Sequence, residues 1–201
     1  MNFIGQYNIN EDLCDELIEF HKTSPNKAKG KIGYGKIIPE MKASTDVEIE
    51  PGANDLVKKY EIELQKCLNA YMIKYVWSTR DHPQFLIREK FNLQHYAPNE
   101  GYHRWHYEQY AHGHMLQRHL VFMTFLNTVM DEGFTEFWYQ RVMCQPVKGR
   151  TLIWPAGWTH THHGIPSQTE EKYIITGWWS HIDHDKNDER AELAWKEESN
   201  V

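Results

Sequence analysis

The feature that most constrains the fold is a change of sequence pattern at Phe85. From there to about residue 180, short runs of aromatic and β-branched residues alternate with turn signals, which is typical of a many-stranded antiparallel fold. The expected strands span residues 85–96, 103–109, 119–127, 134–144, 150–154, 160–163 and 172–180. Evenly spaced strands of this number favour a sandwich, jelly roll or barrel.

The residues before Phe85 carry helical patterns instead. Asn10 is a good N-cap, and the acidic and apolar residues after it predict a short amphipathic helix over residues 10–22. Asn54 is expected to cap a second, longer helix that ends near Tyr75. Residues 22–52 contain several Pro, Gly and Ser residues, so we expect a loop with a short strand there.

The length of the chain favours a single domain, because 201 residues can bury one substantial core and are few for two. Within the domain 1–201, we expect residues 1–80 to form a helical support for the β core of residues 85–180. The almost wholly charged tail, residues 183–201, is expected to be a solvated helix or a frayed end.

Composition narrows the compartment and the partners. The net charge of −6 disfavours nucleic acid, because Lys and Arg drive binding to phosphate backbones. Cys14, Cys67 and Cys144 are widely spaced and form no CxxC motif, so a reducing interior fits best. The N-terminal residues do not resemble a signal peptide, and no stretch approaches the length of a membrane span. We therefore expect a cytoplasmic protein that binds neither nucleic acid nor membrane.

One short motif and a distant histidine cluster point to a metal. His106 and Glu108 form an H-x-E motif, and on an extended segment such residues share one face because side chains alternate with period two. One further histidine would complete a set of two imidazoles and one carboxylate. This set is the facial triad of non-haem Fe(II) sites, which leaves coordination positions open.

The second cluster offers His160, His162 and His163 as the third ligand. Strand alternation places His160 and His162 on one face and His163 on the other, so it does not choose between the first two. The downstream residues favour His162, since Lys172 follows it by ten positions (172 − 162). Lys172, Ile174 and Thr176 are then expected to share one face of the last strand.

The order of these residues resembles the Fe(II)- and 2-oxoglutarate-dependent oxygenases, specifically the prolyl 4-hydroxylase-like branch. The resemblance covers about residues 85–180 and includes three further segments that surround the motif: Gln94-His-Tyr-Ala-Pro-Asn-Glu-Gly101, Asp131-Glu-Gly-Phe-Thr-Glu-Phe137 and Val147-Lys-Gly-Arg-Thr-Leu-Ile-Trp-Pro155. It implies a mostly β fold with N-terminal α-helices, namely a double-stranded β-helix (jelly roll) core supported by two helices.

The resemblance also implies roles for individual residues. His106, Glu108 and His162 would ligate Fe(II) as the catalytic centre, and Lys172 would form a salt bridge to the distal carboxylate of 2-oxoglutarate. Tyr96 lies where a family tyrosine lines the cosubstrate pocket, and Thr176 could add a hydroxyl group to that carboxylate. O2 is the oxidant, and dependence on ascorbate (vitamin C) is a family expectation that no residue here demonstrates.

The resemblance favours hydroxylation of an unactivated C–H bond, with release of succinate and CO2. Glu108 stands where Asp is commoner in the family, but a carboxylate is retained, so hydroxylation is preferred over halogenation. The expected substrate is a peptidyl proline, another protein side chain or an amino acid. The sequence does not distinguish protein from small-molecule substrates, and it does not give the oligomeric state.

Two alternatives remain open from the residues alone. The first is a cupin-type metalloprotein that uses His112, His114 and His160, although the usual glutamate after the HxH is missing and Lys172 stays unexplained. The second is a non-enzymatic jelly-roll binding module with incidental histidines. The polar stretch around His112 and His114 is also expected to border a substrate entrance.

Overall fold

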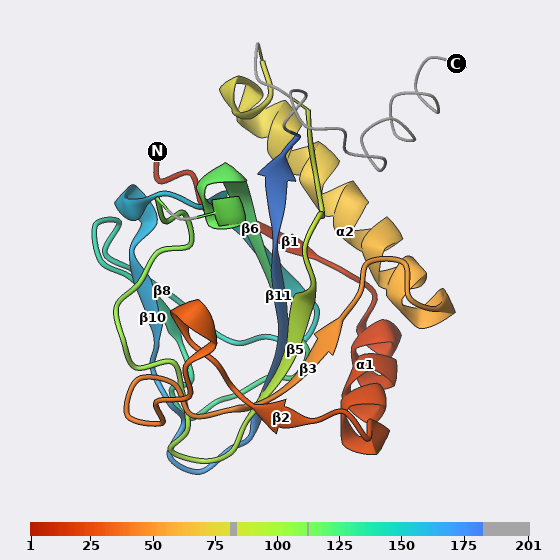
Figure 1. Cartoon of the computed structure of the whole chain (residues 1–201), viewed down its shortest axis with the longest axis vertical. Helices are drawn as coiled ribbons and strands as arrows, with labels where there is room; N and C mark the ends of the chain where they lie inside the picture. Colours follow the sequence, from red (N-terminus) through yellow and green to blue (C-terminus); the bar gives the residue numbers. More distant parts are fainter. Residues whose placement is uncertain (81–83, 112, 183–201) are drawn as a thin grey trace.

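The computed structural model describes residues 1–80, 84–111 and 113–182, so the predicted charged tail lies outside the described residues. The described residues form two antiparallel sheets and two long helices, and Figure 1 shows both helices on the same side of the large sheet. The small sheet lies on the other side (Figure 1). No helix among the described residues is long and apolar enough to cross a membrane.

The large sheet has eight strands, seven of them in the order β1-β9-β6-β11-β5-β3-β2, with β4 paired to β11. The small sheet has the order β10-β7-β8. The strands of the large sheet are β1 (Gly5–Asn8), β2 (Ala28–Lys29), β3 (Thr45–Ile49), β4 (Phe85–Leu86), β5 (Phe91–Tyr96), β6 (Arg118–Phe125), β9 (Arg150–Pro155) and β11 (Lys172–His181). Those of the small sheet are β7 (Thr135–Phe137), β8 (Val142–Cys144) and β10 (His162–Gly164). Short 3₁₀ helices are η1 (Gly33–Gly35), η2 (Val76–Ser78), η3 (Gly113–Gln117) and η4 (Trp158–His160).

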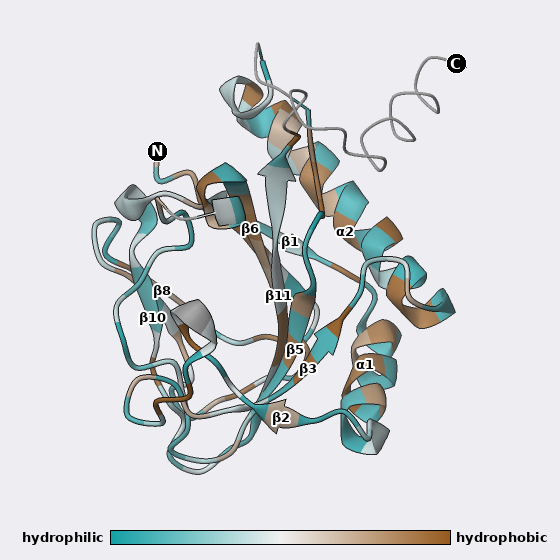
Figure 2. Cartoon of the chain, viewed as in Figure 1, coloured by the Kyte–Doolittle hydropathy of each residue, from teal (hydrophilic) through white to brown (hydrophobic). Residues whose placement is uncertain are grey.

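Both predicted helices and their caps are confirmed. In α1 (Glu11–Thr23) the Asn10 side chain accepts a hydrogen bond from the Asp12 amide, and in α2 (Asp55–Lys74) Asn54 accepts one from the Val57 amide. These bonds satisfy backbone donors that the first turn of a helix leaves free. Apolar and polar residues alternate around both helices, whose apolar faces pack on the large sheet (Figure 2).

Four strand predictions need correction. The predicted strand 85–96 is two strands, β4 and β5, and 134–144 is the hairpin of β7 and β8. The segment 103–109 is not a strand, because its backbone bonds in turn to Met41, His162 and Ala156 and so forms no continuous ladder. The predicted strand 160–163 begins only at His162, since residues 158–160 form η4.

Alternate residues of the large sheet enter two different surroundings. On β6, Leu120 and Phe122 pack against the helices, whereas Val121 and Met123 pack between the two sheets with Phe137 of the small sheet. The first group belongs to the main core with α1 and α2, and the second to a smaller core. The smaller core borders a cavity that is also lined by polar side chains, and the candidate site lies in this cavity.

Candidate active site

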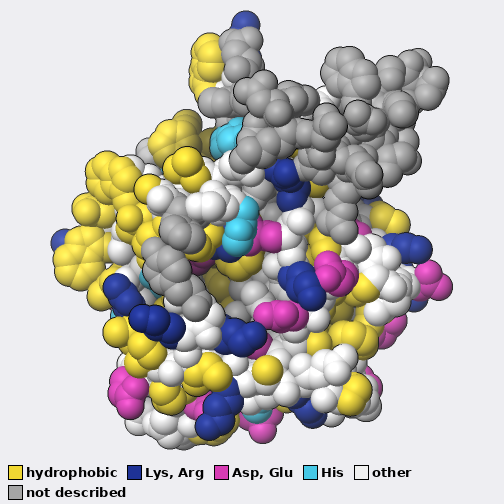
Figure 3. All heavy atoms as spheres, in the orientation of Figure 1, with side chains coloured by type: hydrophobic (Ala, Val, Ile, Leu, Met, Phe, Trp, Pro, Cys, Tyr) yellow, Lys and Arg dark blue, Asp and Glu magenta, His cyan; other side chains and the backbone are white. Residues whose placement is uncertain are grey.

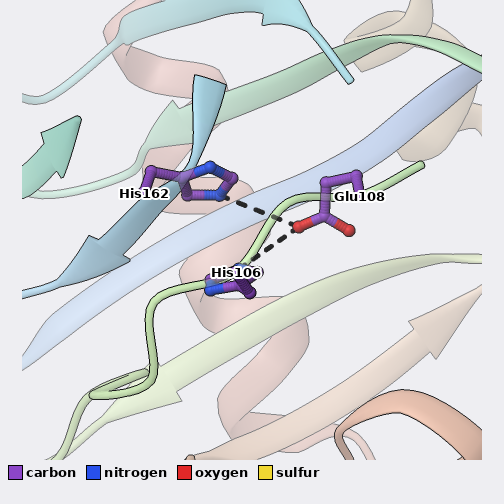
Figure 4. A group of neighbouring side chains, drawn as sticks. All are labelled: His106, Glu108 and His162. Carbon is purple, nitrogen blue, oxygen red and sulfur yellow. Dashed lines mark ion pairs between the residues drawn. The ribbon is translucent and has the colours of Figure 1, made fainter. Parts of the chain in front are cut away.

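His106, Glu108 and His162 come together at one point, and their ligand atoms all lie within 4.8 Å of one another. Glu108 Oε1 is 3.3 Å from His106 Nε2 and 3.7 Å from His162 Nε2 (Figure 4). His106 and Glu108 lie on the irregular segment after β5, and His162 begins β10. The predicted convergence of His106 and Glu108 with the distal histidine is therefore present, although His106 and Glu108 do not lie on a strand.

The backbone fixes the two histidines relative to each other. The His106 amide donates to the His162 carbonyl at 3.0 Å, and the His162 amide donates to the His106 carbonyl at 2.8 Å. This reciprocal pair is an isolated antiparallel bridge between the two segments. Because both backbones are held at these residues, the two imidazoles face each other with ring centroids 4.4 Å apart.

Each imidazole also has its outer nitrogen occupied. His106 Nδ1 lies 2.8 Å from the Arg104 carbonyl, and His162 Nδ1 lies 2.8 Å from the His160 carbonyl. A carbonyl can only accept, so Nδ1 carries the proton and Nε2 is left with a free lone pair. Histidines that bind a metal usually donate their other ring N–H to a carbonyl or carboxylate in this way.

The site favours the protonation states that a metal requires. Burial lowers the pKa of His162, and the neighbouring His106 lowers it further, so the imidazole is neutral. Burial raises the pKa of Glu108, but the close contact with His106 and the charge of Arg118 outweigh this and lower it overall to about 2. A neutral imidazole and an ionised carboxylate are the forms that bind metal ions. The three residues could therefore hold a divalent ion.

The other histidines of the distal cluster point elsewhere. His160 is buried, and its Nε2 lies 3.0 Å from the Asn2 carbonyl. His163 faces the opposite side of β10, as strand alternation predicts, and pairs with Glu136 at 3.0 Å. His114 is exposed and lies 3.3 Å from Glu89, while His112 is outside the described residues. His114 and His160 thus do not form the cupin-type set among the residues described.

A cavity of about 650 Å³ opens beside the three residues. Figure 3 shows this face of the molecule hollowed, with basic, acidic and histidine side chains gathered around the hollow. His106, Glu108 and His162 all line the cavity, and so do the three residues that the sequence assigns to the cosubstrate: Lys172, Tyr96 and Thr176. Lys172 and Thr176 share one face of β11, as predicted.

Two lysines are buried in the cavity wall, each with only 4% of its surface exposed, and they differ in one respect. Lys42 forms an ion pair with Asp46 at 2.6 Å. Lys172 Nζ instead donates to the carbonyls of Gly133 at 2.9 Å and Ile165 at 3.5 Å, and no carboxylate pairs with it in the described part of the chain. Burial lowers the pKa of Lys172 to about 8. A buried cation without a counter-charge is costly, so an anionic ligand would be stabilised there.

Two hydroxyl groups that line the cavity already donate within the protein. Tyr96 donates to Gln94 Oε1 at 2.7 Å, and Thr176 donates to the Phe122 carbonyl at 2.9 Å. A carboxylate that accepted a hydrogen bond from either residue would have to replace that acceptor. Thr135 of β7 also lines the cavity, and among the described residues its hydroxyl group donates only to the Met123 sulfur, at 3.9 Å. Thr135 lies in one of the segments that carry the family resemblance, but the sequence alone predicts no role for it.

Sequence reasoning missed the partners of Glu108. Its Oε2 atom accepts hydrogen bonds from Trp178 Nε1 at 3.0 Å and from Arg118 Nη1 at 3.2 Å. Arg118 in turn binds Glu89 through two parallel bonds. Since Arg118 and Glu89 are 29 residues apart, no local spacing signals this link.

The comparisons with known proteins agree with this geometry. Residues 91–180 match the family described as the 2OG-Fe(II) oxygenase superfamily. A search of the curated proteins finds no match. The family implies Fe(II), 2-oxoglutarate and O2 as the cofactor and cosubstrates.

Solved prolyl hydroxylases share the fold over 90% of this chain. The viral collagen prolyl hydroxylase of Paramecium bursaria Chlorella virus-1, in its 2-oxoglutarate complex, is 18% identical over 97% of its own length, with a TM-score of 0.68. The Pseudomonas putida prolyl-4-hydroxylase is 16% identical over 94% of its length, with a TM-score of 0.70. The Trichoplax adhaerens prolyl hydroxylase, bound to a hypoxia inducible factor peptide fragment, is 15% identical over 84% of its length, with a TM-score of 0.71.

At these identities the solved structures establish the fold alone, whereas the family match covers the segment that carries His106, Glu108 and His162. Residues 91–180 of the chain therefore match the 2OG-Fe(II) oxygenase superfamily, and the chain has the fold of solved prolyl hydroxylases.

Proposed function

We propose that this protein is an Fe(II)- and 2-oxoglutarate-dependent dioxygenase that hydroxylates an unactivated C–H bond. One observation carries the proposal: two imidazole nitrogens and one carboxylate oxygen converge in a cavity that also contains a buried lysine without a counter-charge. The triad suits Fe(II) with open positions. The lysine suits a dicarboxylate cosubstrate, which the triad alone would not explain.

The residues fit these groups as follows. His106, Glu108 and His162 would hold the iron through Nε2, Oε1 and Nε2, because their other polar atoms are bonded to protein groups. Lys172 would bind the distal carboxylate of 2-oxoglutarate, and its ammonium group has three donors, of which carbonyls occupy two. Tyr96 and Thr176 would line the cosubstrate with their hydroxyl oxygens.

The iron, 2-oxoglutarate and O2 together supply the oxidising chemistry, in which one oxygen atom enters the substrate hydroxyl and the other enters succinate as CO2 is released. The chain itself orients these groups and excludes water. Tyr102 stacks on His106 with ring centroids 3.7 Å apart, and Trp154 meets His162 edge-on at 5.0 Å. Such packing holds the ligand rings in place before the substrate arrives.

The substrate is proposed to be a peptidyl proline, with another protein or amino-acid side chain as the wider class. The cavity wall near the triad is rich in aromatic rings, which include Tyr102, Tyr107, Tyr110 and Trp178. Aromatic rings of this kind can pack against an apolar pyrrolidine. The cavity remains open to the surface, so a residue within a longer peptide could enter it.

Several wider expectations belong to the same proposal. The two sheets would be the two halves of a double-stranded β-helix, with residues 1–80 as its helical support within a single domain. The protein would act in the cytoplasm and would need ascorbate to keep its iron reduced. These expectations come from the sequence and the family, and each is open to direct assay.

The experiment that tests the function is anaerobic addition of Fe(II) and 2-oxoglutarate to the purified protein. Chelation of the iron by the keto acid should produce a weak visible charge-transfer band, which Glu108→Ala and His162→Ala should lose. If metal binds but no band appears, the cosubstrate assignment is wrong. If no metal binds to the wild type, the hypothesis of a non-enzymatic binding module is favoured instead.

The substrate class requires a second assay, which measures the succinate formed with each candidate. A proline-containing peptide should stimulate succinate formation above the uncoupled rate, and the same peptide with Ala in place of Pro should not. Free L-proline is the third arm, because stimulation by the free amino acid alone would assign a small-molecule substrate instead.

A further inference from the structure

The two oxygens of Glu108 have different surroundings. Oε1 faces the Nε2 atoms of His106 and His162, at 3.3 and 3.7 Å, as Figure 4 shows. Oε2 points away from them and accepts hydrogen bonds from Trp178 and Arg118. Only Oε1 is therefore free to meet a metal ion, although a carboxylate can in general offer both oxygens.

Arg118 is itself held on three sides. Its Nε and Nη2 atoms donate to the two oxygens of Glu89, at 2.9 and 2.5 Å. Its guanidinium carbon lies 3.5 Å from the ring centroid of Trp178, and its Nη1 also donates to the Glu108 carbonyl at 3.2 Å. The side chain is 7% exposed. Because the guanidinium group stacks on Trp178 and forms two parallel hydrogen bonds with Glu89, it has little freedom to move.

A break in the sheet places Arg118 on the cavity side. Along β6 and β11, Val121 pairs with Trp178 and Leu120 with Trp179, but Ser180 pairs with Arg118, so the register shifts by one residue. Without the shift, Arg118 would lie on the same face of β6 as Leu120, which is the face that packs against the helices. Irregularities of this kind are known to re-aim side chains beside active sites.

We propose that Arg118 is a positioning residue that fixes Glu108 as a one-oxygen metal ligand, with Glu89 as its counter-charge and Trp178 as its support. The inference rests on the proposed iron site and deepens it. Glu108 has one methylene more than the commoner Asp, and therefore more side-chain conformations to restrict. The bonds from Arg118 and Trp178 restrict them before the metal binds.

Glu89 has a separate part in this arrangement. A lone guanidinium so close to the triad would repel a divalent ion and would draw Glu108 away from the histidines. With Glu89 paired, the formal charges of Glu89, Arg118 and Glu108 are −1, +1 and −1, so the group keeps a net charge of −1 toward the metal. We therefore expect the loss of Glu89 to weaken metal binding although Glu89 does not face the triad.

The test is titration of the full-length protein with Mn(II), an ion that substitutes for Fe(II) without oxidising, with the free ion followed by electron paramagnetic resonance. Arg118→Gln should weaken Mn(II) binding by about 10-fold to 100-fold, the usual range for residues that orient metal ligands. Glu89→Gln should weaken it less, and Trp178→Phe, which removes one donor but keeps a ring under the guanidinium, least. Arg118→Lys should restore part of the affinity. Arg150→Lys is the matched control, because Arg150 donates to the Gln145 carbonyl and does not line the cavity.

A second readout separates positioning from general stability. The Fe(II)–2-oxoglutarate charge-transfer band should shift in wavelength in the Arg118 and Trp178 variants, because the ligand field changes. A residue that only stabilised the fold would lower the amplitude of the band in proportion to unfolded protein and leave its wavelength unchanged.

The outcomes are distinguishable. If the wild type binds neither Mn(II) nor Fe(II), the proposed function fails, and this inference fails with it. If the wild type binds metal and the folded variants bind it equally well with an unshifted band, the function stands and the role of Arg118 is overturned.

Discussion

The two faces of β11 differ in what holds them together. Tyr173, Ile175 and Trp179 turn to the helices and are packed in the main apolar core. The residues that alternate with them line the cavity: Lys172, Ile174, Thr176 and Trp178. One strand therefore contributes to a face that is packed in an apolar core and to a face that borders an open cavity, where Lys172 has no carboxylate partner among the described residues.

This difference teaches where stability and function reside in the sheet. Burial of apolar groups stabilises the helix side by about 25 cal/mol for each Å² removed from water. The cavity side forgoes part of that gain by keeping a volume of about 650 Å³ open and a cation buried. Substitutions on the helix side should hence unfold the protein, while those on the cavity side should disable it without unfolding it.

The largest effect is expected from the distal histidines. His162→Ala should abolish detectable Fe(II) binding, because it removes one of three ligands, and should leave the melting temperature of the metal-free protein nearly unchanged. His160→Ala should still bind iron, because His160 bonds to the Asn2 carbonyl and not to the triad. Metal titration with a thermal melt checks both, and loss of iron in the His160 variant alone would mean that the other histidine is the ligand.

The next effect compares two neighbouring isoleucines of β11. Ile175→Ala should lower the free energy of unfolding by about 2–5 kcal/mol, because the fully buried side chain leaves a cavity in the main core. Ile174→Ala should cost less, because its side chain already borders an open cavity, but it should weaken 2-oxoglutarate binding. Urea unfolding and cosubstrate titration measure the two. If Ile174→Ala and Ile175→Ala lowered the free energy of unfolding equally, the two faces of β11 would not differ in their contribution to stability.

The elements predicted correctly from sequence were those with local signals. Asn10 and Asn54 cap their helices through contacts within three residues, and alternation along the last strand correctly predicts that Lys172, Ile174 and Thr176 share one face. His162 was favoured by its spacing from Lys172, and it is the histidine that joins the triad. Short-range rules suffice where the determining contact is itself short in sequence.

The features that were missed depend on contacts distant in sequence. The N-terminal strand β1 gives no strong strand pattern and exists because it pairs with β9 at the sheet edge. The bulge that turns Arg118 toward the cavity arises from the pairing of β6 with β11. Alternation along β6 alone would place Arg118 on the helix side of the sheet. The segment 103–109 fails as a strand for a similar reason, since three separate segments share its backbone bonds.

The two buried lysines give a third comparison, within the cavity itself. Lys42→Met should destabilise the protein by about 3–5 kcal/mol, because it leaves Asp46 buried without its cation. Lys172→Met should not destabilise the cosubstrate-free protein, since it removes a cation that has no carboxylate partner among the described residues. It should weaken 2-oxoglutarate binding by about 100-fold or more while Fe(II) binding changes little. Unchanged cosubstrate affinity in this variant would remove the role assigned to Lys172.

The smallest effect is the pH dependence that the unpaired lysine imposes. Burial lowers the pKa of Lys172 from 10.5 to about 8, so between these values the unfolded chain holds a proton that the folded protein has released. Stability rises with pH wherever the unfolded state binds more protons. The wild type should therefore gain stability relative to Lys172→Met from about pH 8 to 10.5, by at most about 3 kcal/mol (2.5 pKa units of about 1.36 kcal/mol each), and stay parallel to it below pH 8.

The difference between the two proteins is the quantity to measure, because the pKa values of Tyr7 and Tyr173 are raised by burial and change the stability of both alike. Urea unfolding at a series of pH values, with and without 2-oxoglutarate, gives that difference. A carboxylate bound to Lys172 favours its charged form, so saturating cosubstrate should abolish the rise in the wild type and leave the variant unaffected. A rise that persists with cosubstrate bound would show that Lys172 remains unpaired, and the anion site would have to lie elsewhere in the cavity.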